Sequence, residues 1–140
     1  MIKKMVAELV KEYGTNDPFL LADHLGIHIE SEPLGNRGAY FTNIFGYPII
    51  HINSNIPKHI AKYACAHELG HALLHQDLNI SWLSIHSYHN KCKTEREANQ
   101  FAVELLLPDT LITENTDISL AQLAKIVGVP EEMLSLKRLC

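Results

Sequence analysis

Two histidines four residues apart, with a glutamate directly after the first, are the side chains of this sequence best suited to chemistry. They form the run His67-Glu68-Leu69-Gly70-His71. On a helix, positions i and i+4 lie one above the other, so His67 and His71 can both offer a ring nitrogen to one zinc ion. Glu68 is about 100° further round the helix, where it could touch a water molecule held at the site. This geometry predicts two metal ligands and a general base.

The flanking residues predict a helix that carries this run. Asn53 to Asn55 offers N-cap candidates and Pro57 suits a first helical turn, so the helix is expected from about Pro57 to His75. A helical histidine is more often packed or solvated than a ligand. Two imidazoles in a largely apolar row would nevertheless be costly without a metal, which favours the metal-site interpretation.

A catalytic zinc site needs a third protein ligand and an open position. His75 continues the row, but it lies about 12 Å of helix rise beyond His67, so one ion cannot reach both. His75 is therefore expected to be a C-terminal helix residue that interacts favourably with the helix dipole. Asp77 stands where some zinc peptidases place a third histidine, and it is only a distant candidate.

A second predicted helix, from Thr94 to Pro108, carries a better candidate. Thr94 is a potential N-cap, and Glu97 would complete a capping box. Glu95 is in line with the apolar stripe of this helix, whereas Glu97 points toward its flank. Glu95 is therefore the acid expected to face the metal. Asn99, one turn later, could hydrogen-bond a liganding imidazole or carboxylate.

Together these motifs resemble the ImmA/IrrE family of gluzincin-type metallopeptidases. The resemblance covers about Leu20 to Leu139 and rests on several runs, namely His67 to His75, Glu95 with Ala98-Asn99 and Phe101-Ala102, Leu105 to Pro108, Pro48 to Asn53, Ser119 to Ala124, and Gly128-Val129. It implies that His67, His71 and Glu95 are zinc ligands and that Glu68 is the base. It also implies a bacterial, phage or mobile-element protein. Several members of the family cleave helix-turn-helix repressors encoded nearby, so the resemblance implies such a substrate.

Composition is consistent with one small enzyme domain. The 140 residues are 46% hydrophobic and 20% charged, which is enough apolar content for a single domain spanning residues 1–140. A net charge of −4 argues against non-specific nucleic-acid binding. Because charged residues interrupt every apolar run, neither a membrane span nor a secretion signal is expected, and a cytoplasmic location is. Three cysteines without C-x-x-C spacing argue against disulfides and thiolate metal sites.

The remaining elements predict an α+β fold. Apolar spacing indicates helices over Ile2 to Tyr13 and Pro18 to Leu25, and alternation indicates a short strand over Ile27 to Glu30. Ala39 to Ile52 reads as a hairpin. Pro48 suggests that Tyr47 to Ile52 is an edge strand beside the metal, able to pair with an extended peptide. The expected architecture is a zincin-like domain, with a small sheet packed against the active-site helix and a helical C-terminal segment.

That C-terminal segment, about residues 119–139, has the spacing of a helix-turn-helix. Gly128 would supply the turn, and a second helix would begin near Pro130. Glu131 and Glu132 would repel phosphate at the start of a reading helix, so packing or protein docking is favoured over DNA binding.

Four side chains could stabilise an oxyanion, namely Tyr40, His86, Tyr88 and His89, but for each a partly buried surface role is the simpler interpretation.

The function that the sequence favours is zinc-dependent limited proteolysis of a protein, with a helix-turn-helix repressor as the expected substrate. Two alternatives remain open. One is a regulator whose zinc site is not catalytic and which docks a repressor without cutting it. The other is a DNA-binding regulator that acts through the C-terminal segment.

Overall fold

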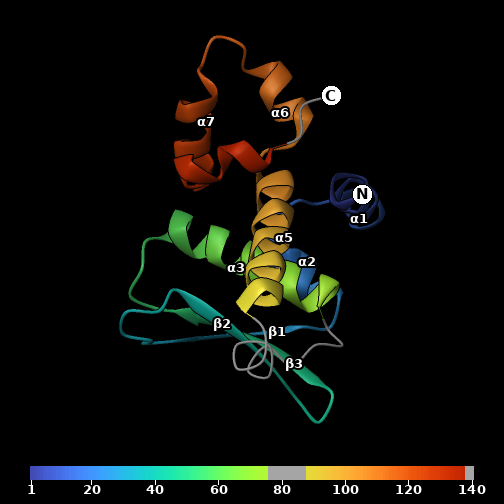
Figure 1. Ribbon diagram of the computed structural model, residues 1–140, viewed down its shortest axis with the longest axis vertical. Helices are drawn as coiled ribbons and strands as arrows, with labels where there is room; N and C mark the ends of the chain where they lie inside the picture. Colours follow the sequence, from blue (N-terminus) through green and yellow to red (C-terminus); the bar gives the residue numbers. More distant parts are fainter. Residues whose placement is uncertain (76–87, 138–140) are drawn as a thin grey trace.

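The computed structural model describes residues 1–75 and 88–137, with side chains from residue 92 onward in the second part (Figure 1). In chain order the elements are α1 (Ile2–Tyr13), α2 (Pro18–His24), β1 (His28–Glu32), β2 (Ala39–Ile44), β3 (Tyr47–Asn53), α3 (Lys58–Leu74), α5 (Tyr88–Leu106), α6 (Asp109–Glu114), α7 (Leu120–Val127) and a 3-10 helix, η1 (Glu131–Leu136). The mixture of helices with a three-stranded sheet confirms the predicted α+β class. None of the described helices combines the length and the apolarity that crossing a membrane requires.

The first two helices begin and end at the residues that the sequence predicts, within one position. Gly14 adopts a left-handed conformation (φ 71°) at the C-terminus of α1, and its backbone N–H donates to the carbonyl of Val10. At the start of α2, the Asp17 side chain accepts from the backbone N–H of Phe19 at 2.9 Å. Local turn and capping signals therefore account for the end of α1 and the start of α2.

The sheet has the order β1-β3-β2, which corrects one expectation. β2 and β3 form the predicted antiparallel hairpin, but β1 pairs with β3 in parallel, so the strand over Tyr47–Asn53 is central rather than an edge. Pro48 pairs with Asn43 of β2 and precedes Ile49, where the pairing with β1 begins. The missing N–H of proline is thus tolerated in a stretch that has a neighbour on one side only.

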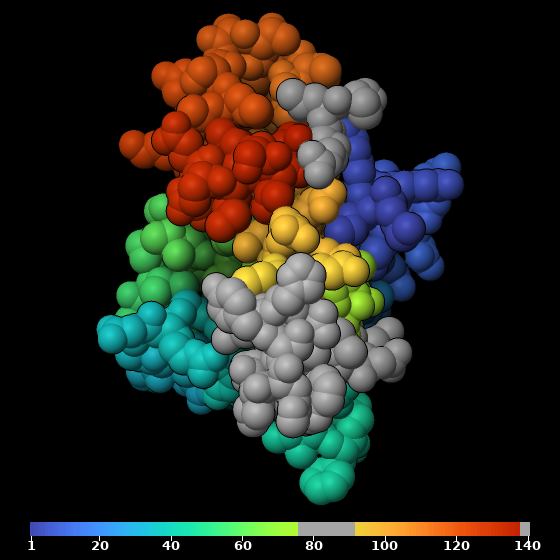
Figure 2. Space-filling view, viewed as in Figure 1, coloured from blue at the N-terminus to red at the C-terminus, as the bar shows by residue number. Residues whose placement is uncertain are grey.

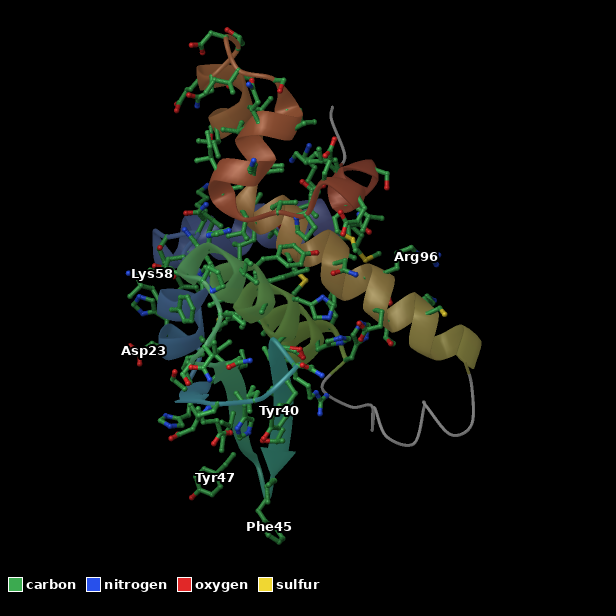
Figure 3. All side chains as sticks on the ribbon, turned by 90° about the vertical axis from the view of Figure 1, so that its left-hand side faces the viewer. Asp23, Tyr40, Phe45, Tyr47, Lys58 and Arg96 are labelled. Carbon is green, nitrogen blue, oxygen red and sulfur yellow. The ribbon has the colours of Figure 1, made fainter. Side chains whose placement is uncertain are left out.

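The far end of the hairpin projects from the molecule (Figure 2). Phe45 and Tyr47 point outward there, with Phe45 96% exposed (Figure 3). Phe45 and Gly46 both have positive φ angles, 52° and 81°, as a tight two-residue turn of this kind requires. The other end of the hairpin lies nearer the helices, since Gly38 lies beside Ala64 of α3.

Helix α3 packs against the sheet on one side and against α5 on the other, and this pair of helices holds the core (Figure 1). Gly70 permits their close approach: a Cβ atom at this position would lie 3.0 Å from the Cβ of Phe101 and 3.2 Å from the Cα and the carbonyl oxygen of Ala98. Leu69, Phe101 and Leu105 are fully buried around this crossing. The contact fixes how residues of α3 and α5 face one another.

Helix α5 begins earlier than predicted. It starts at Tyr88, six positions before Thr94, so Thr94 lies inside the helix, buried, and is not its N-cap. The expected capping box between Thr94 and Glu97 is therefore wrong. No proline or glycine interrupts the residues from Tyr88 to Thr94, and a threonine inside a helix costs little against the burial of an apolar face.

The C-terminal elements lie at the opposite end of the molecule from the hairpin turn (Figure 2). Ser119 and Gln122 form a complete capping box at the start of α7, and Gly128 ends this helix with φ 90°. The helix predicted from Pro130 is a six-residue 3-10 helix. Beyond it, the buried ammonium of Lys137 pairs with Glu104 of α5 at 2.5 Å and with Asp109 of α6 at 2.9 Å.

Candidate metal centre

Helix α3 presents His67 and His71 on one face, one turn apart, as the spacing predicts. Their ring centroids are 4.8 Å apart and the rings are nearly perpendicular. His71 is only 5% exposed, whereas His67 is partly exposed. The helix bounds also agree with the prediction, since Pro57 and His75 are its capping residues.

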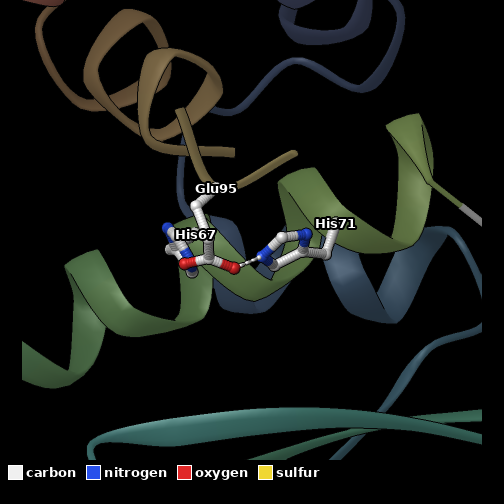
Figure 4. A group of neighbouring side chains, drawn as sticks. All are labelled: His67, His71 and Glu95. Atoms are coloured by element: carbon white, nitrogen blue, oxygen red, sulfur yellow. Dashed lines mark hydrogen bonds and ion pairs between the residues drawn. The ribbon is translucent and has the colours of Figure 1, made fainter. Parts of the chain in front are cut away.

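Glu95 of α5 meets both imidazoles (Figure 4). Its Oε1 lies 2.7 Å from Nε2 of His71, and its Oε2 lies 3.2 Å from Nε2 of His67. The three side chains offer ligand atoms that all lie within 4.8 Å of one another. Two imidazole nitrogens and one carboxylate oxygen are a donor set typical of catalytic zinc sites, which leave one position open, so the residues present fit this ion.

The shared contacts change the protonation of these groups. Hydrogen bonds from His67 and His71 hold the pKa of Glu95 well below its usual range, against the opposing effect of burial. For His67, burial alone would lower the pKa. The hydrogen bond to Glu95 and the charge of Glu68 outweigh it and raise the pKa above its ordinary value. The carboxylate of Glu95 is therefore the ionised, electron-donating member of the group.

Glu68 follows His67 on the same helix and is 9% exposed. Burial raises the pKa of its carboxyl group, while the neighbouring His67 and His71 lower it in part. Arg37, just before β2, acts in the same direction as the histidines. A carboxylate whose pKa is moved toward neutrality is better suited to proton transfer than an ordinary surface glutamate.

Asn99 lies one turn after Glu95 and has the contact that the sequence predicts. Its Oδ1 accepts a hydrogen bond from Nδ1 of His67 at 2.8 Å. The same oxygen accepts a second bond, from the hydroxyl of Tyr63, at 2.7 Å. Sequence reasoning missed Tyr63. The available signal was its position four residues before His67, on the same helical face.

Glu97 and His75 lie together beside this group rather than in it. The His75 Nε2 is 3.8 Å from the Glu97 Oε1, and burial lowers the pKa of His75. The structure thus places Glu95 against His67 and His71, and it places Glu97 against His75.

Tyr40 is the oxyanion candidate whose side chain the structure describes. Tyr40 stacks on His51 of β3, with ring centroids 4.2 Å apart, and carries the Arg37 guanidinium 5.0 Å above its own ring. The side chains of Asp77, His86, Tyr88 and His89 lie outside the described residues.

Comparisons with known proteins agree with this geometry. The model of the peptidase family M78, described as the IrrE N-terminal-like domain, matches residues 22–138. An uncharacterized immunity region protein 2 of Bacillus phage phi105 is 38% identical over 143 residues, covering 99% of this chain and 90% of the relative. Metallopeptidase ImmA of Bacillus subtilis (strain 168) is 34% identical over 115 residues, covering 81% of this chain and 67% of the relative.

Both the extent of the family match and the level of identity exceed what a shared motif alone would produce. Membership supports a metal-dependent peptidase. The chain belongs to the ImmA/IrrE family.

Proposed function

We propose that this protein is a zinc-dependent endopeptidase that makes limited cuts in a helix-turn-helix transcriptional repressor. The observation that carries the catalytic part is the convergence of two Nε2 atoms, from His67 and His71, on the two oxygens of Glu95. The donor set suits zinc, and the family relationship supports peptidase chemistry.

In this proposal His67, His71 and Glu95 hold the ion, and Glu68 handles protons. When bound, zinc supplies Lewis-acid activation of water and of a peptide carbonyl group. The Glu68 carboxylate accepts a proton from the attacking water and delivers it to the leaving amine. Its buried position and raised pKa support both halves of this exchange.

The sheet suggests where an extended substrate segment would lie. With β3 in the centre, β2 (Ala39–Ile44) is an outer strand that packs against α3, and a Cβ atom added at Gly38, just before β2, would lie 3.8 Å from the Cβ of Ala64. An unpaired strand edge can bind an extended peptide through main-chain hydrogen bonds. We place the substrate along β2 rather than along Tyr47–Asn53.

The choice of substrate rests on different support. One relative is named for a phage immunity region and the other for metallopeptidase activity, and together these names favour a regulatory protein as the target. Unrestricted proteolysis would also damage the host, so a single partner is the more economical expectation.

Co-expression with the helix-turn-helix repressor that we expect to be encoded beside the gene tests this function. The wild-type chain should produce one or two discrete repressor fragments, and Glu68→Gln should produce none while retaining the metal and the fold, because an amide accepts no proton from water. Glu12→Gln, an exposed change on α1, is the matched control and should cleave normally. A repressor that stays intact, co-purifies with the wild-type chain and still leaves its operator would replace this proposal with non-catalytic docking.

A further inference from the structure

Behind the candidate ligands, a polar contact links the first half of α3 to α5. Tyr63 lies one turn before His67 on α3, and Asn99 lies one turn after Glu95 on α5. The Oδ1 atom of Asn99 accepts two hydrogen bonds, one from the Tyr63 hydroxyl at 2.7 Å and one from Nδ1 of His67 at 2.8 Å. The candidate ligands thus continue into a row of side chains that alternate between the two helices.

The chemistry of the amide oxygen determines where the protons are. A carbonyl oxygen can only accept, so both partners must donate, and Nδ1 of His67 must carry a hydrogen. A neutral imidazole has one protonated nitrogen and one with a free lone pair. With a proton held on Nδ1, the hydrogen that Nε2 shares with Glu95 is the one that an ion displaces, and Nε2 then offers its lone pair to that ion.

Tyr63 favours one of the two orientations of the Asn99 side-chain amide. An asparagine side chain can present either its oxygen or its NH2 group to a neighbour, and the two orientations would place opposite demands on His67. A tyrosine hydroxyl that donates to Asn99 favours the orientation with oxygen inward. Burial raises the pKa of Tyr63, and the charges of Glu132 and Glu95 add to this effect, so the hydroxyl keeps its proton.

The two histidines differ in this respect. Among the described residues, Nδ1 of His71 is buried and has no hydrogen-bond partner. His71 instead makes the shorter contact with Glu95. Within this part of the chain, a hydrogen bond to Nδ1 therefore fixes the ring proton of His67 but not that of His71.

We propose that Tyr63 is a positioning residue that acts through Asn99, keeping the proton of His67 on Nδ1 and presenting Nε2 to the metal. This inference rests on the proposed function only in taking His67 as a ligand. Groups that hold the distal nitrogen of a liganding histidine set its tautomer and orientation, and their loss typically lowers metal affinity about 10–100-fold.

A double-mutant cycle on zinc affinity tests whether Tyr63 acts through Asn99. Asn99→Leu should weaken zinc binding about 10–100-fold, and Tyr63→Phe should weaken it by a smaller factor. The double variant should be no weaker than Asn99→Leu alone, because the hydroxyl then has no amide to orient. Asn99→Asp, which keeps an acceptor oxygen, should restore most of the affinity. Tyr47→Phe, on the exposed hairpin, is the matched control and should match wild type.

The hydrogen bond itself can be read by nitrogen-15 NMR of the zinc-saturated full chain. In the wild type the Nδ1–H of His67 should exchange slowly with solvent, because Asn99 accepts it. In Asn99→Leu this hydrogen should exchange faster, and in Asn99→Asp it should stay protected. Circular dichroism of each variant checks that the helices persist.

Two results would overturn the relay: an Nδ1 hydrogen of wild-type His67 that exchanges as fast as in Asn99→Leu, or independent and multiplying losses of affinity in the double variant. Failure of the proposed function looks different. A wild-type chain with a protected Nδ1 hydrogen that binds zinc but cleaves nothing would refute the peptidase and leave the relay intact.

Discussion

His67 and His71 share the carboxylate of Glu95. In the proposed site, removing either imidazole leaves two protein ligands, too few for a stable catalytic zinc site. We expect about one zinc per wild-type chain, and its loss from His67→Ala and from His71→Ala. His59→Ala, an exposed change in the first turn of α3, should keep the metal. Elemental analysis after dialysis measures all four proteins, and full occupancy in either ligand variant would reject the site.

The contrast between Glu95 and Glu97 gives a second test. Glu95 contacts both His67 and His71, the proposed ligands, whereas Glu97 lies 3.8 Å from His75. Glu95→Ala should therefore lower zinc affinity by orders of magnitude. Glu97→Ala should leave zinc affinity unchanged and cost no more than about 1 kcal/mol of unfolding free energy, because Glu97 is partly exposed and its contact with His75 is long. Zinc titration and urea unfolding measure the two effects, and the reverse pattern would require a site built around Glu97.

Part of this residue-level arrangement was predictable because it depends on spacing within one helix. The i, i+4 relation placed His67 with His71 and Glu95 with Asn99. The bond between Tyr63 and Asn99 was not predictable, because it depends on how far α3 and α5 are displaced along one another. Only the packed structure determines that displacement.

Among the elements too, features that depend on local sequence were predicted, and features that depend on pairing or packing between distant segments were missed. The hairpin of β2 and β3 and both N-terminal helices follow from local turn and capping residues. The central place of β3 results from parallel pairing with β1, across more than a dozen intervening residues, and no local signal encodes it. Pro48 was misleading because the pairing with β1 begins only at Ile49, so Tyr47 and Pro48 have a strand partner on one side while the strand as a whole is central. For α5, burial of the face that carries Ala98, Phe101, Ala102 and Leu105 outweighs the local cap signal at Thr94.

Gly70 allows a prediction about the contact between α3 and α5. An added methyl group would meet the Cβ of Phe101 and the backbone of Ala98, so Gly70→Ala should force the helices apart. Overpacking of this kind costs about 1–3 kcal/mol, more than the gain in helix propensity of about 1 kcal/mol. Zinc affinity should fall as well, because Glu95 moves with α5. Ala64→Gly, on the same helix, separates the propensity effect from the steric one, and an unchanged or stabilised Gly70→Ala protein would contradict this view of the crossing.

At the scale of the whole molecule, a buried ion pair holds the last described residue to the core. The side chains of Lys137 and Glu104 are 1% and 2% exposed, and Asp109 joins Lys137 to Lys3 of α1. Lys137→Met should cost about 3–5 kcal/mol, because it leaves the carboxylate of Glu104 buried without this cation. Adding Glu104→Leu should recover much of the loss. Urea unfolding measures both, with the exposed Lys125→Met as control, and a single variant as stable as wild type would show that the pair contributes little.

The meeting of His71 and Glu95 also has a consequence for the polymer as a whole. These residues are 24 positions apart, and an ion bound by both would close the intervening chain into a ring. Ring closure removes conformations from the denatured ensemble, an effect of about 3–4 kcal/mol for a covalent link of this span. The same side chains would then serve two purposes, as ligands for catalysis and as a reversible cross-link. The free energy of unfolding would rise with the concentration of free metal.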